Sequence, residues 1–247
     1  MSAQPAAMPT PGVPRTRILV GDVRRVLATL PAKSVHCIVT SPPYWGLRDY
    51  KVPPSVWGGD SACDHEWGAT QRAPWANDVP GPNSGGKNAG FRNHIKDTGP
   101  FCAKCGAWRG CLGLEPTVEL FLDNLVAVFR DCWRVLRDDG TLWLNIGDSY
   151  AGSGRGPTGA NGIGQHERRQ GFHSPGASHG VRAKSMMLIP ERLLLALQAD
   201  GWIVRDKVVW HKTSAMPENV RDRCSDAWEP VYQLTKRGRY FADMEAV

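Results

Sequence analysis

The fold is decided by residues 35–46, which read VHCIVTSPPYWG. The first five residues are mostly apolar and rich in β-branched side chains, which predicts a strand buried in a parallel sheet. The two prolines that follow lack an amide hydrogen, so the hydrogen-bond ladder ends there. The carbonyl oxygens of Ser41 and Pro42 are then left to accept from another donor, beside the flat rings of Tyr44 and Trp45. An amino group on an aromatic ring would fit this combination.

A strand and a helix are expected just before this stretch. Residues 17–20 predict a short strand, and apolar residues at helical spacing predict a helix from Val23 to Leu30 with a buried face. Strand, helix and strand then form one right-handed crossover, and ligands of such sheets bind at the carboxyl ends of the strands. Asp22 lies at that edge, where it either caps the helix or lies near a ligand.

The second half of the chain predicts five further elements. They are a helix at 116–136 stopped by residues 138–140, a strand at 141–146, a helix at 187–199, and two antiparallel strands at 202–210 and 226–234. Asp148 follows the strand at 141–146, where it either lines a pocket or forms a turn.

Residues 46–112 interrupt this pattern with Gly-, Pro- and Asn-rich sequence, and we interpret them as an insertion. The insertion contains two pairs of metal-ligand side chains, Cys63 with His65 and Cys102 with Cys105. Two residues between thiolates allow both sulfurs to bind one ion, so the four side chains predict a tetrahedral zinc site. Because all four positions are filled by protein, the zinc would be structural and would stabilise a loop too polar to fold alone.

The spacing of the ligand pairs leaves alternatives open. With 36 residues between the pairs, the pattern is less specific than that of a short zinc finger. The alternatives are free thiols, or Cys111 in place of one ligand. Trp67, Trp75 and Trp108 lie near the site in the sequence, and they either pack on it or stack on bases.

The motif Ser41-Pro42-Pro43-Tyr44 resembles the catalytic tetrapeptide of the amino-group DNA methyltransferases. The similar segments follow in the family's order over most of the chain: LVGD at 19–22, PAKSV at 31–35, GTLWLNIGD at 140–148, WHK at 210–212 and RDR at 221–223. The resemblance implies an α/β fold, namely part of a Rossmann-like methyltransferase sheet with helices on both faces and a zinc-stabilised irregular insertion.

The resemblance also implies a reaction. Enzymes of this family transfer a methyl group from S-adenosylmethionine to an exocyclic amine of a base flipped out of the DNA duplex. Ser41 and Pro42 would accept from the amine within the Ser41–Tyr44 turn, Tyr44 would stack on the base, and Asp22 would lie near the cofactor. A serine in the first position favours N4 of cytosine over N6 of adenine.

The charge distribution is consistent with double-stranded DNA as the partner. Residues 151–212 contain nine Lys and Arg against four Asp and Glu, in a chain with a net charge of +6. The segment 151–185 predicts a flexible basic loop whose phosphate ligands would be Arg155, Arg168, Arg169 and Arg182. The alternatives are a solvated loop with incidental charge and, for the whole chain, a DNA-binding module without catalytic activity. Methylation of RNA or protein fits the order of segments less well.

One feature departs from the family pattern. Members with this order of segments have a Phe-x-Gly-x-Gly cofactor loop after the catalytic half, and no such motif occurs in these 247 residues. We therefore expect an incomplete catalytic domain over residues 15–247, with weak or absent activity alone, and a second chain as one source of the cofactor-binding half.

The composition agrees with a globular enzyme. Hydrophobic residues make up 41% and charged residues 22%, and no apolar run approaches the 18 residues of a membrane span. Residues 1–14, which contain mainly Ala, Pro, Ser and Gly, predict a disordered leader. They do not predict a signal peptide, because no basic segment precedes an apolar one. An odd number of cysteines, seven, favours reduced thiols, some of them on metal. We expect a cytoplasmic location.

Overall fold

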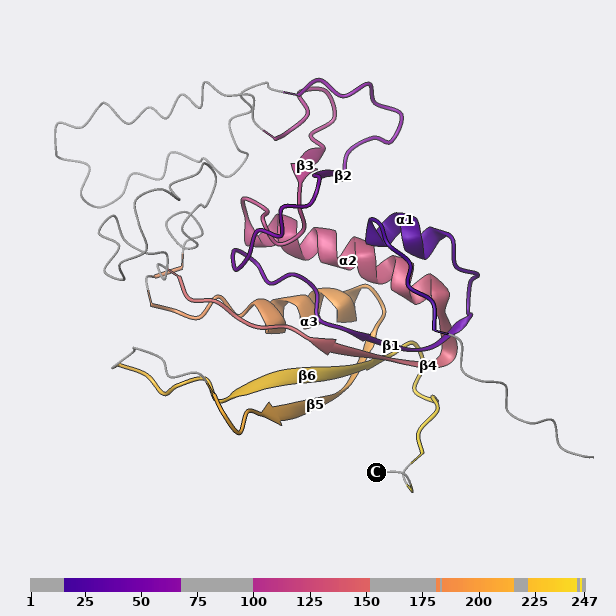
Figure 1. Cartoon of the computed structure of the whole chain (residues 1–247), viewed down its shortest axis with the longest axis vertical. Coiled ribbons are helices and arrows are strands. Elements are labelled where there is room, and N and C mark those ends of the chain that lie inside the picture. The colour runs from indigo at the N-terminus through magenta and orange to yellow at the C-terminus, as the bar shows by residue number, and fades with distance from the viewer. Residues whose placement is uncertain are drawn as a thin grey trace, which may run out of the picture.

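The main sheet has four strands in the order β1-β4-β6-β5 (Figure 1). Their bounds in the computed structural model are Val35–Thr40 for β1, Leu136–Asn145 for β4, Ile203–His211 for β5 and Trp228–Thr235 for β6. β1 is parallel to β4, whereas β6 is antiparallel to both of its neighbours. The structure describes residues 16–67, 100–151, 181–182, 184–215, 222–243 and 245. The mixed α/β class is therefore confirmed, and the expected leader at 1–14 lies outside the described residues.

Alternate residues of the two central strands form the core side of the sheet. Leu142 and Leu144 of β4 are fully buried, and their register partners Leu234 and Tyr232 on β6 are buried as well. These side chains belong to one core cluster with the apolar face of α2, Val118–Val135. Because each fully buried large apolar side chain contributes about 1.5–3 kcal/mol, this layer holds the sheet and α2 together.

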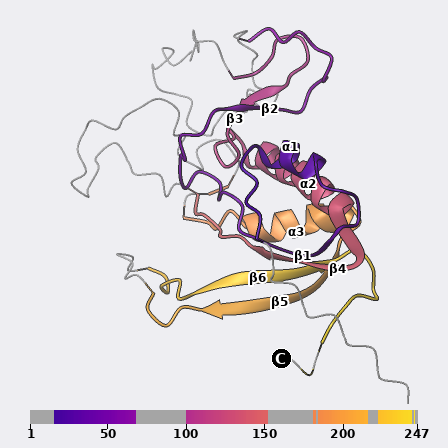
Figure 2. The same ribbon diagram turned by 45° about the vertical axis from the view of Figure 1, so that its right-hand side comes forward.

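The three helices lie on one face of the sheet (Figures 1 and 2). They are α1 at Val23–Ala28, α2, and α3 at Ile189–Ala199. The prediction of helices on both faces was wrong for the described part of the chain. The exposure of Val39 on β1 shows that the opposite face is uncovered there. Val39 pairs with Trp143 and is 79% exposed, because no described element covers that side of the strand.

The strand expected at residues 17–20 does not form. These residues pair with no strand in the described part of the chain, and the side chains of Ile18 and Val20 are 85% and 92% exposed. A β-branched sequence becomes a strand only when a neighbouring strand accepts its hydrogen bonds. The helix after it is also shorter than expected: α1 ends at Ala28 and buries no residue completely, although Leu27 packs against the core.

The connection from α2 to β4 differs from the prediction as well. α2 begins at Val118 rather than at Pro116, and Thr117 caps it, because its side chain accepts from the amide of Leu120 at 3.1 Å. The helix ends at Val135, and residues 138–140 lie inside β4 because the register jumps from Leu136 to Thr141. This bulge requires a glycine, since a Cβ on Gly140 would lie 2.7 Å from the carbonyl oxygen of His36.

The insertion at 46–112 contains a two-stranded antiparallel sheet that the sequence did not predict. Its strands are β2, Ser55–Trp57, and β3, Trp108–Gly110. Trp57 and Trp108 face each other across the pair, and both are buried. This sheet brings the two ends of the insertion together, whereas residues 68–99 lie outside the described residues.

The last three predicted elements are confirmed to within two residues. α3 begins at Ile189, and the antiparallel strands β5 and β6 pair from Ile203–Thr235 to His211–Trp228. Asp148 forms the expected turn, because its carboxylate accepts from the amide of Ser149 at 2.8 Å, and it also accepts from the amides of Leu188 and Ile189, each at 3.0 Å. It thereby ties the end of β4 to the start of α3.

None of the helices in the described part of the chain combines the length and apolar character that a membrane crossing requires.

Replacement of Arg134 tests how α1 is held. The Arg134 guanidinium donates to the carbonyls of Leu27 at 2.6 Å and Leu30 at 3.0 Å, at the end of α1. We expect Arg134→Met to lower the free energy of unfolding by about 1–3 kcal/mol, because two charge-assisted hydrogen bonds to the backbone are lost. Urea unfolding measures it. The control is Arg130→Met, which removes an exposed ion pair with Asp200 and should cost at most about 1 kcal/mol; equal losses in the two variants would contradict this role.

Candidate active site

The turn Ser41–Tyr44 lies where β1 ends, at the same edge as the ends of β4 and β5 and the start of β6. Among the described residues, no turn, loop or side-chain hydrogen bond ends on the carbonyl oxygen of Ser41 or Pro42. Ser41 is exposed, and Pro42, Pro43 and Tyr44 are half-buried. The two main-chain oxygens for which the consecutive prolines provide no strand partner thus lie at an accessible edge of the sheet.

Asn145, the last residue of β4, joins the two hydroxyls of the turn. The Tyr44 hydroxyl donates to Asn145 Oδ1 at 2.7 Å, and Ser41 Oγ lies 3.2 Å from the same oxygen. Asn145 Nδ2 donates to the carbonyl of Pro230 at 3.0 Å, so the amide links the turn to β6. The sequence analysis did not single out Asn145; its position at the predicted end of a strand was the available signal.

Two glycines allow the turn to pack closely. A Cβ on Gly147 would lie 2.7 Å from Cε2 of the Tyr44 ring, and one on Gly113 would lie 3.0 Å from Cβ of Pro43. Gly113 has a φ of +90°, and its carbonyl accepts from the amide of Gly46 at 2.8 Å. The Tyr44 ring is therefore supported by backbone on one side, and the end of the insertion holds the turn in place.

A charged pair lies next to Tyr44. Lys212, just after β5, binds the carboxylate of Glu229 on β6 at 2.5 Å. The hydrogen bond from Lys212 holds the pKa of Glu229 below its usual range, against the opposing effect of burial. Burial raises the pKa of Tyr44, and the negative charge of Glu229 adds to the rise. Tyr44 is therefore a neutral phenol at neutral pH, which can donate to Asn145.

Trp45 does not offer a free ring, contrary to the prediction. Its side chain is only 5% exposed, and its indole Nε1 donates to the carbonyl of Glu115 at 2.9 Å. Glu115 is itself buried, and its carboxylate accepts from the amide of Gly113 at 2.8 Å and from Asn124 Nδ2 at 2.9 Å. The tryptophan side chain therefore anchors the turn to the core, which leaves the half-buried Tyr44 as the aromatic group of the turn at the edge.

Asp22 caps α1, as one of its two predicted roles requires. Its carboxylate accepts from the Arg24 amide at 3.0 Å, from the Arg24 guanidinium and from the Ser55 hydroxyl at 2.5 Å. Although burial acts to raise it, the pKa of Asp22 falls to about 2 because Arg24 and Ser55 stabilise the charged form. The cofactor role of Asp22 stays a prediction, since its oxygens already have these partners.

The four predicted metal ligands are together. The ligand atoms of Cys63, His65, Cys102 and Cys105 all lie within 4.8 Å of one another. The Cys63 and Cys102 sulfurs are 3.9 Å apart, and the Cys105 sulfur is 3.3 Å from His65 Nδ1. Gly106 after the second pair has a φ of +73°, the left-handed turn expected of a Cys-x-x-Cys-Gly segment. Three sulfurs and an imidazole nitrogen at such distances suit a single tetrahedral ion.

Cys111, the alternative ligand, is not part of this cluster, and its thiol donates to the carbonyl of Val52 at 3.3 Å. Trp67 and Trp108 belong to the packing of this region, since His65 stacks on Trp67 at 4.8 Å between ring centroids and Trp108 is buried. Trp75 lies outside the described residues. The packing role is therefore confirmed for Trp108.

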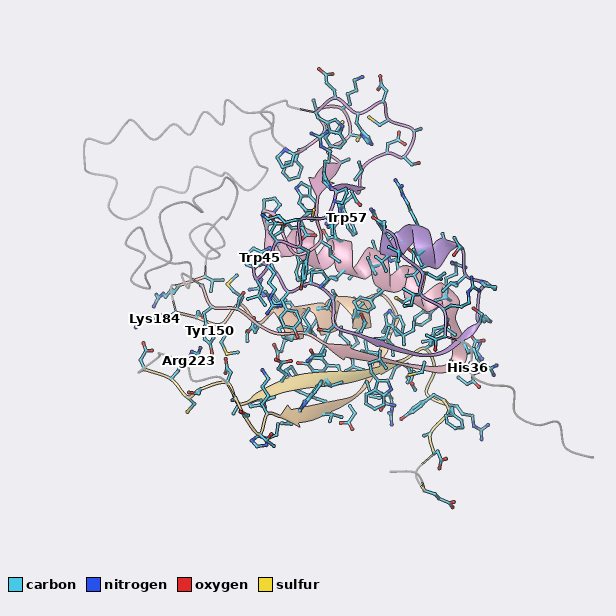
Figure 3. The ribbon with its side chains drawn as sticks, in the orientation of Figure 1. His36, Trp45, Trp57, Tyr150, Lys184 and Arg223 are labelled. Carbon is cyan, nitrogen blue, oxygen red and sulfur yellow. The ribbon has the colours of Figure 1, made fainter. Side chains whose placement is uncertain are left out.

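Of the four predicted phosphate ligands, only Arg182 is described, and it is exposed. Arg155, Arg168 and Arg169 lie outside the described residues. Figure 3 shows Tyr150, Lys184 and Arg223 at the end of the molecule opposite His36, and the Arg223 guanidinium lies 4.5 Å from the Tyr150 ring. Lys184 pairs with Asp222 at 2.5 Å. Basic side chains are thus present at the end of β4, which also carries Asn145.

Two surface hollows of the described chain lie at the other end of the sheet. One of about 340 Å³ is lined by Lys33 before β1, Asp138 at the β4 bulge and Lys236 after β6, among others. The polar groups that converge at the edge with the Ser41–Tyr44 turn form a candidate ligand site at the strand ends of an α/β protein.

Comparison with known proteins assigns the family. The family model described as DNA methylase matches residues 35–246, so the chain belongs to this DNA methylase family. The type II methyltransferase M.Cfr9I of Citrobacter freundii is 35% identical over 92% of this chain and 56% of its own length. M.SmaI of Serratia marcescens is 32% identical over 94% of this chain and 59% of its own length. The chain spans about half the length of these curated relatives.

Solved structures were compared as well. The PvuII DNA methyltransferase (cytosine-N4-specific) aligns with a TM-score of 0.48 and 12% identity, over 92% of this chain and 51% of that chain. TTHA0409, a putative DNA modification methylase of Thermus thermophilus complexed with S-adenosyl-L-methionine, aligns with a TM-score of 0.44 and 21% identity, over 92% of this chain and 56% of that chain.

The buried Glu115 predicts a pH dependence of stability. Burial raises its pKa to about 7, and the hydrogen bonds from Asn124 and Gly113 offset this only in part. The native state therefore retains a proton that the unfolded chain has lost, and stability falls as the pH rises from about 4.5 to about 7, by about 3 kcal/mol. In urea unfolding, Glu115→Gln should lose less stability than the wild type between about pH 5 and about pH 8.

Glu119→Gln, on an exposed position of α2, is the control for this comparison and should follow the wild type. Parallel pH profiles for the wild type and Glu115→Gln would show that Glu115 is not the titrating group.

Proposed function

We propose that this chain carries the catalytic turn of a DNA methyltransferase that uses S-adenosylmethionine to methylate an exocyclic amine, with N4 of cytosine preferred to N6 of adenine. The observation that carries the proposal is the Ser41–Tyr44 turn. Among the described residues, its two main-chain carbonyls accept no hydrogen bond from a turn, a loop or a side chain. The aromatic ring of Tyr44, which is packed against Gly147, lies beside them. The preference for cytosine depends on Ser41, the neutral first residue of the motif.

The chemistry requires that the base leave the duplex, because the amine is otherwise stacked and paired. The Ser41 and Pro42 main-chain oxygens would accept the two amine protons. This draws the nitrogen lone pair out of conjugation with the ring, so that it can attack the methyl group. S-adenosylmethionine, when bound, supplies a methyl group on a sulfonium sulfur, which leaves as a neutral thioether once the methyl carbon bonds to nitrogen. The methylated nitrogen then loses one proton through the acceptors of the turn to solvent. Positioning accounts for most of the catalysis.

The described residues give partial support for the cofactor. The carboxyl edge of the sheet is where ligands of α/β folds bind, and the turn lies there. Asp22 is the chain's own candidate for a polar contact to the cofactor, and such a contact would compete with the four hydrogen bonds that Arg24 and Ser55 donate to its oxygens. DNA as the substrate is supported by the net charge of +6 and by the exposed Arg182 near the same edge.

Tyr44→Ala tests the function. Stacking of one base on an aromatic ring contributes about 1–3 kcal/mol, so transfer of a labelled methyl group to mixed-sequence DNA should fall about five- to hundredfold. Tyr240→Ala is the matched control, since Tyr240 bonds Arg205 and lines a hollow at the far end of the sheet. Full activity in Tyr44→Ala would contradict base stacking. DNA binding by the wild type without any methyl transfer would instead favour a binding module.

We also propose a structural zinc ion held by Cys63, His65, Cys102 and Cys105. The four ligand atoms are close enough for one ion, and they occupy all positions of a tetrahedron. The ion would join the two ends of the insertion next to β2 and β3, and so support Ser55 and Gly113, which contact Asp22 and the turn.

Metal analysis of Cys102→Ser tests the zinc site. We expect about one zinc ion per wild-type chain, a loss of most of it in Cys102→Ser, and a lower unfolding temperature in that variant or after chelation. Cys224→Ser, an exposed cysteine outside the cluster, should keep the metal. Equal zinc contents in the two variants would remove the site from the account.

A further inference from the structure

Asn145 is placed where one side chain can control both hydroxyls of the turn. It ends β4 and pairs in register with Val231 of β6, so its backbone is fixed by the ladder on that side. Its side chain points toward Ser41 and Tyr44, with Oδ1 at 3.2 Å and 2.7 Å from their oxygens. No other described side chain contacts both hydroxyls within hydrogen-bond distance.

The orientation of the Asn145 amide is determined by its surroundings. Nδ2 donates to the Pro230 carbonyl at 3.0 Å. A backbone carbonyl is an acceptor only, so it requires the NH₂ group on its side. The carbonyl oxygen of the amide must then face the turn. A flipped amide would place Oδ1 against the Pro230 carbonyl, which costs that hydrogen bond.

A carbonyl oxygen that faces two hydroxyls sets the direction of both hydrogen bonds. Asn145 Oδ1 has two lone pairs and no proton, so Tyr44 and Ser41 each donate to it. Ser41 Oγ lies 3.4 Å from the Tyr44 oxygen, which offers an alternative acceptor for the same proton. In either arrangement the Ser41 proton points into the protein. The lone pairs of the exposed Ser41 oxygen then point outward.

We propose that Asn145 is a positioning residue that fixes the Ser41 hydroxyl as a hydrogen-bond acceptor for the amine of the target base, where the hydroxyl shares one amine proton with the Ser41 carbonyl. This inference rests on the proposed function. It explains how a serine can occupy the first position of the turn: an ionised carboxylate can only accept, whereas a hydroxyl can also donate unless its own proton is held by another partner. A Ser41 proton directed at the amine would oppose two donors and weaken binding of the base.

The test compares Asn145→Leu in three backgrounds: wild type, Ser41→Ala and Tyr44→Phe. Single-turnover methyl transfer by the full chain with S-adenosylmethionine is measured, together with the Kd for DNA. In the wild type and in Tyr44→Phe we expect Asn145→Leu to lower the rate about tenfold, the effect of one hydrogen bond, with the Kd within about twofold. In Ser41→Ala the same substitution should change the rate by less than about twofold.

A second readout needs no cofactor. DNA binding is compared between a duplex with the normal target base and one whose target base lacks the amine, 2-pyrimidinone for cytosine or purine for adenine. The wild type should prefer the normal base about five- to tenfold, and Asn145→Leu should remove this preference. Gln233→Leu is the control, because Gln233 is an amide of the neighbouring strand whose register partner, Trp143, lies on the same face as Asn145. It should leave both readouts unchanged.

The outcomes separate this inference from the function on which it rests. If the chain alone transfers no methyl group, the second readout decides: a wild type that shows no preference for the normal base overturns the proposed function, and the inference with it. An active wild type with an unchanged Asn145→Leu overturns the inference alone. So does an equal loss in all three backgrounds, which indicates a structural role, or a loss that disappears only in Tyr44→Phe, which assigns the effect to Tyr44. If circular dichroism shows that Asn145→Leu is unfolded, Asn145→Ala takes its place in the same comparison.

Discussion

The end of the β1 hydrogen-bond ladder is the constraint on which the rest of the site depends. Two consecutive prolines cannot donate to the neighbouring strand, so the chain turns away from β4 and leaves main-chain oxygens at an accessible edge. The ends of β4 and β5 and the start of β6 bring Asn145, Lys212 and Glu229 to that edge. The sheet topology therefore gathers polar side chains around a local backbone constraint, and together they form the candidate site.

The insertion is part of this arrangement rather than an appendage. Gly113 contacts the turn directly, and Glu115 holds both Gly113 and, through its main-chain oxygen, Trp45. At the other end, Ser55 and Val56 bind Asp22 and Arg24 at the start of α1. A metal ion that joins Cys63, His65, Cys102 and Cys105 would thus stabilise the segment that positions the Ser41–Tyr44 turn.

The sequence predicted the elements with strong periodicity and the groups with short-range motifs. β1, α2, α3, the β5–β6 pair and the cluster of four metal ligands are where the patterns place them. The strand expected at 17–20 failed because a strand depends on a partner that no local pattern reveals. Trp45 was misassigned for a related reason, since only the tertiary structure shows that Glu115 binds its indole. Asn145 and Glu229 were missed because they are far from the turn in sequence.

The position of the transferred methyl group tests the central claim most directly. DNA is incubated with the full chain and S-adenosylmethionine carrying a labelled methyl group, hydrolysed to nucleosides, and analysed by mass spectrometry. Acceptors that hold an amine predict a label on an exocyclic nitrogen, as N4-methylcytosine or, if adenine is the target, N6-methyladenine. A label on carbon 5 of cytosine would contradict the account, because methylation at carbon does not use the acceptors that Ser41 and Pro42 provide.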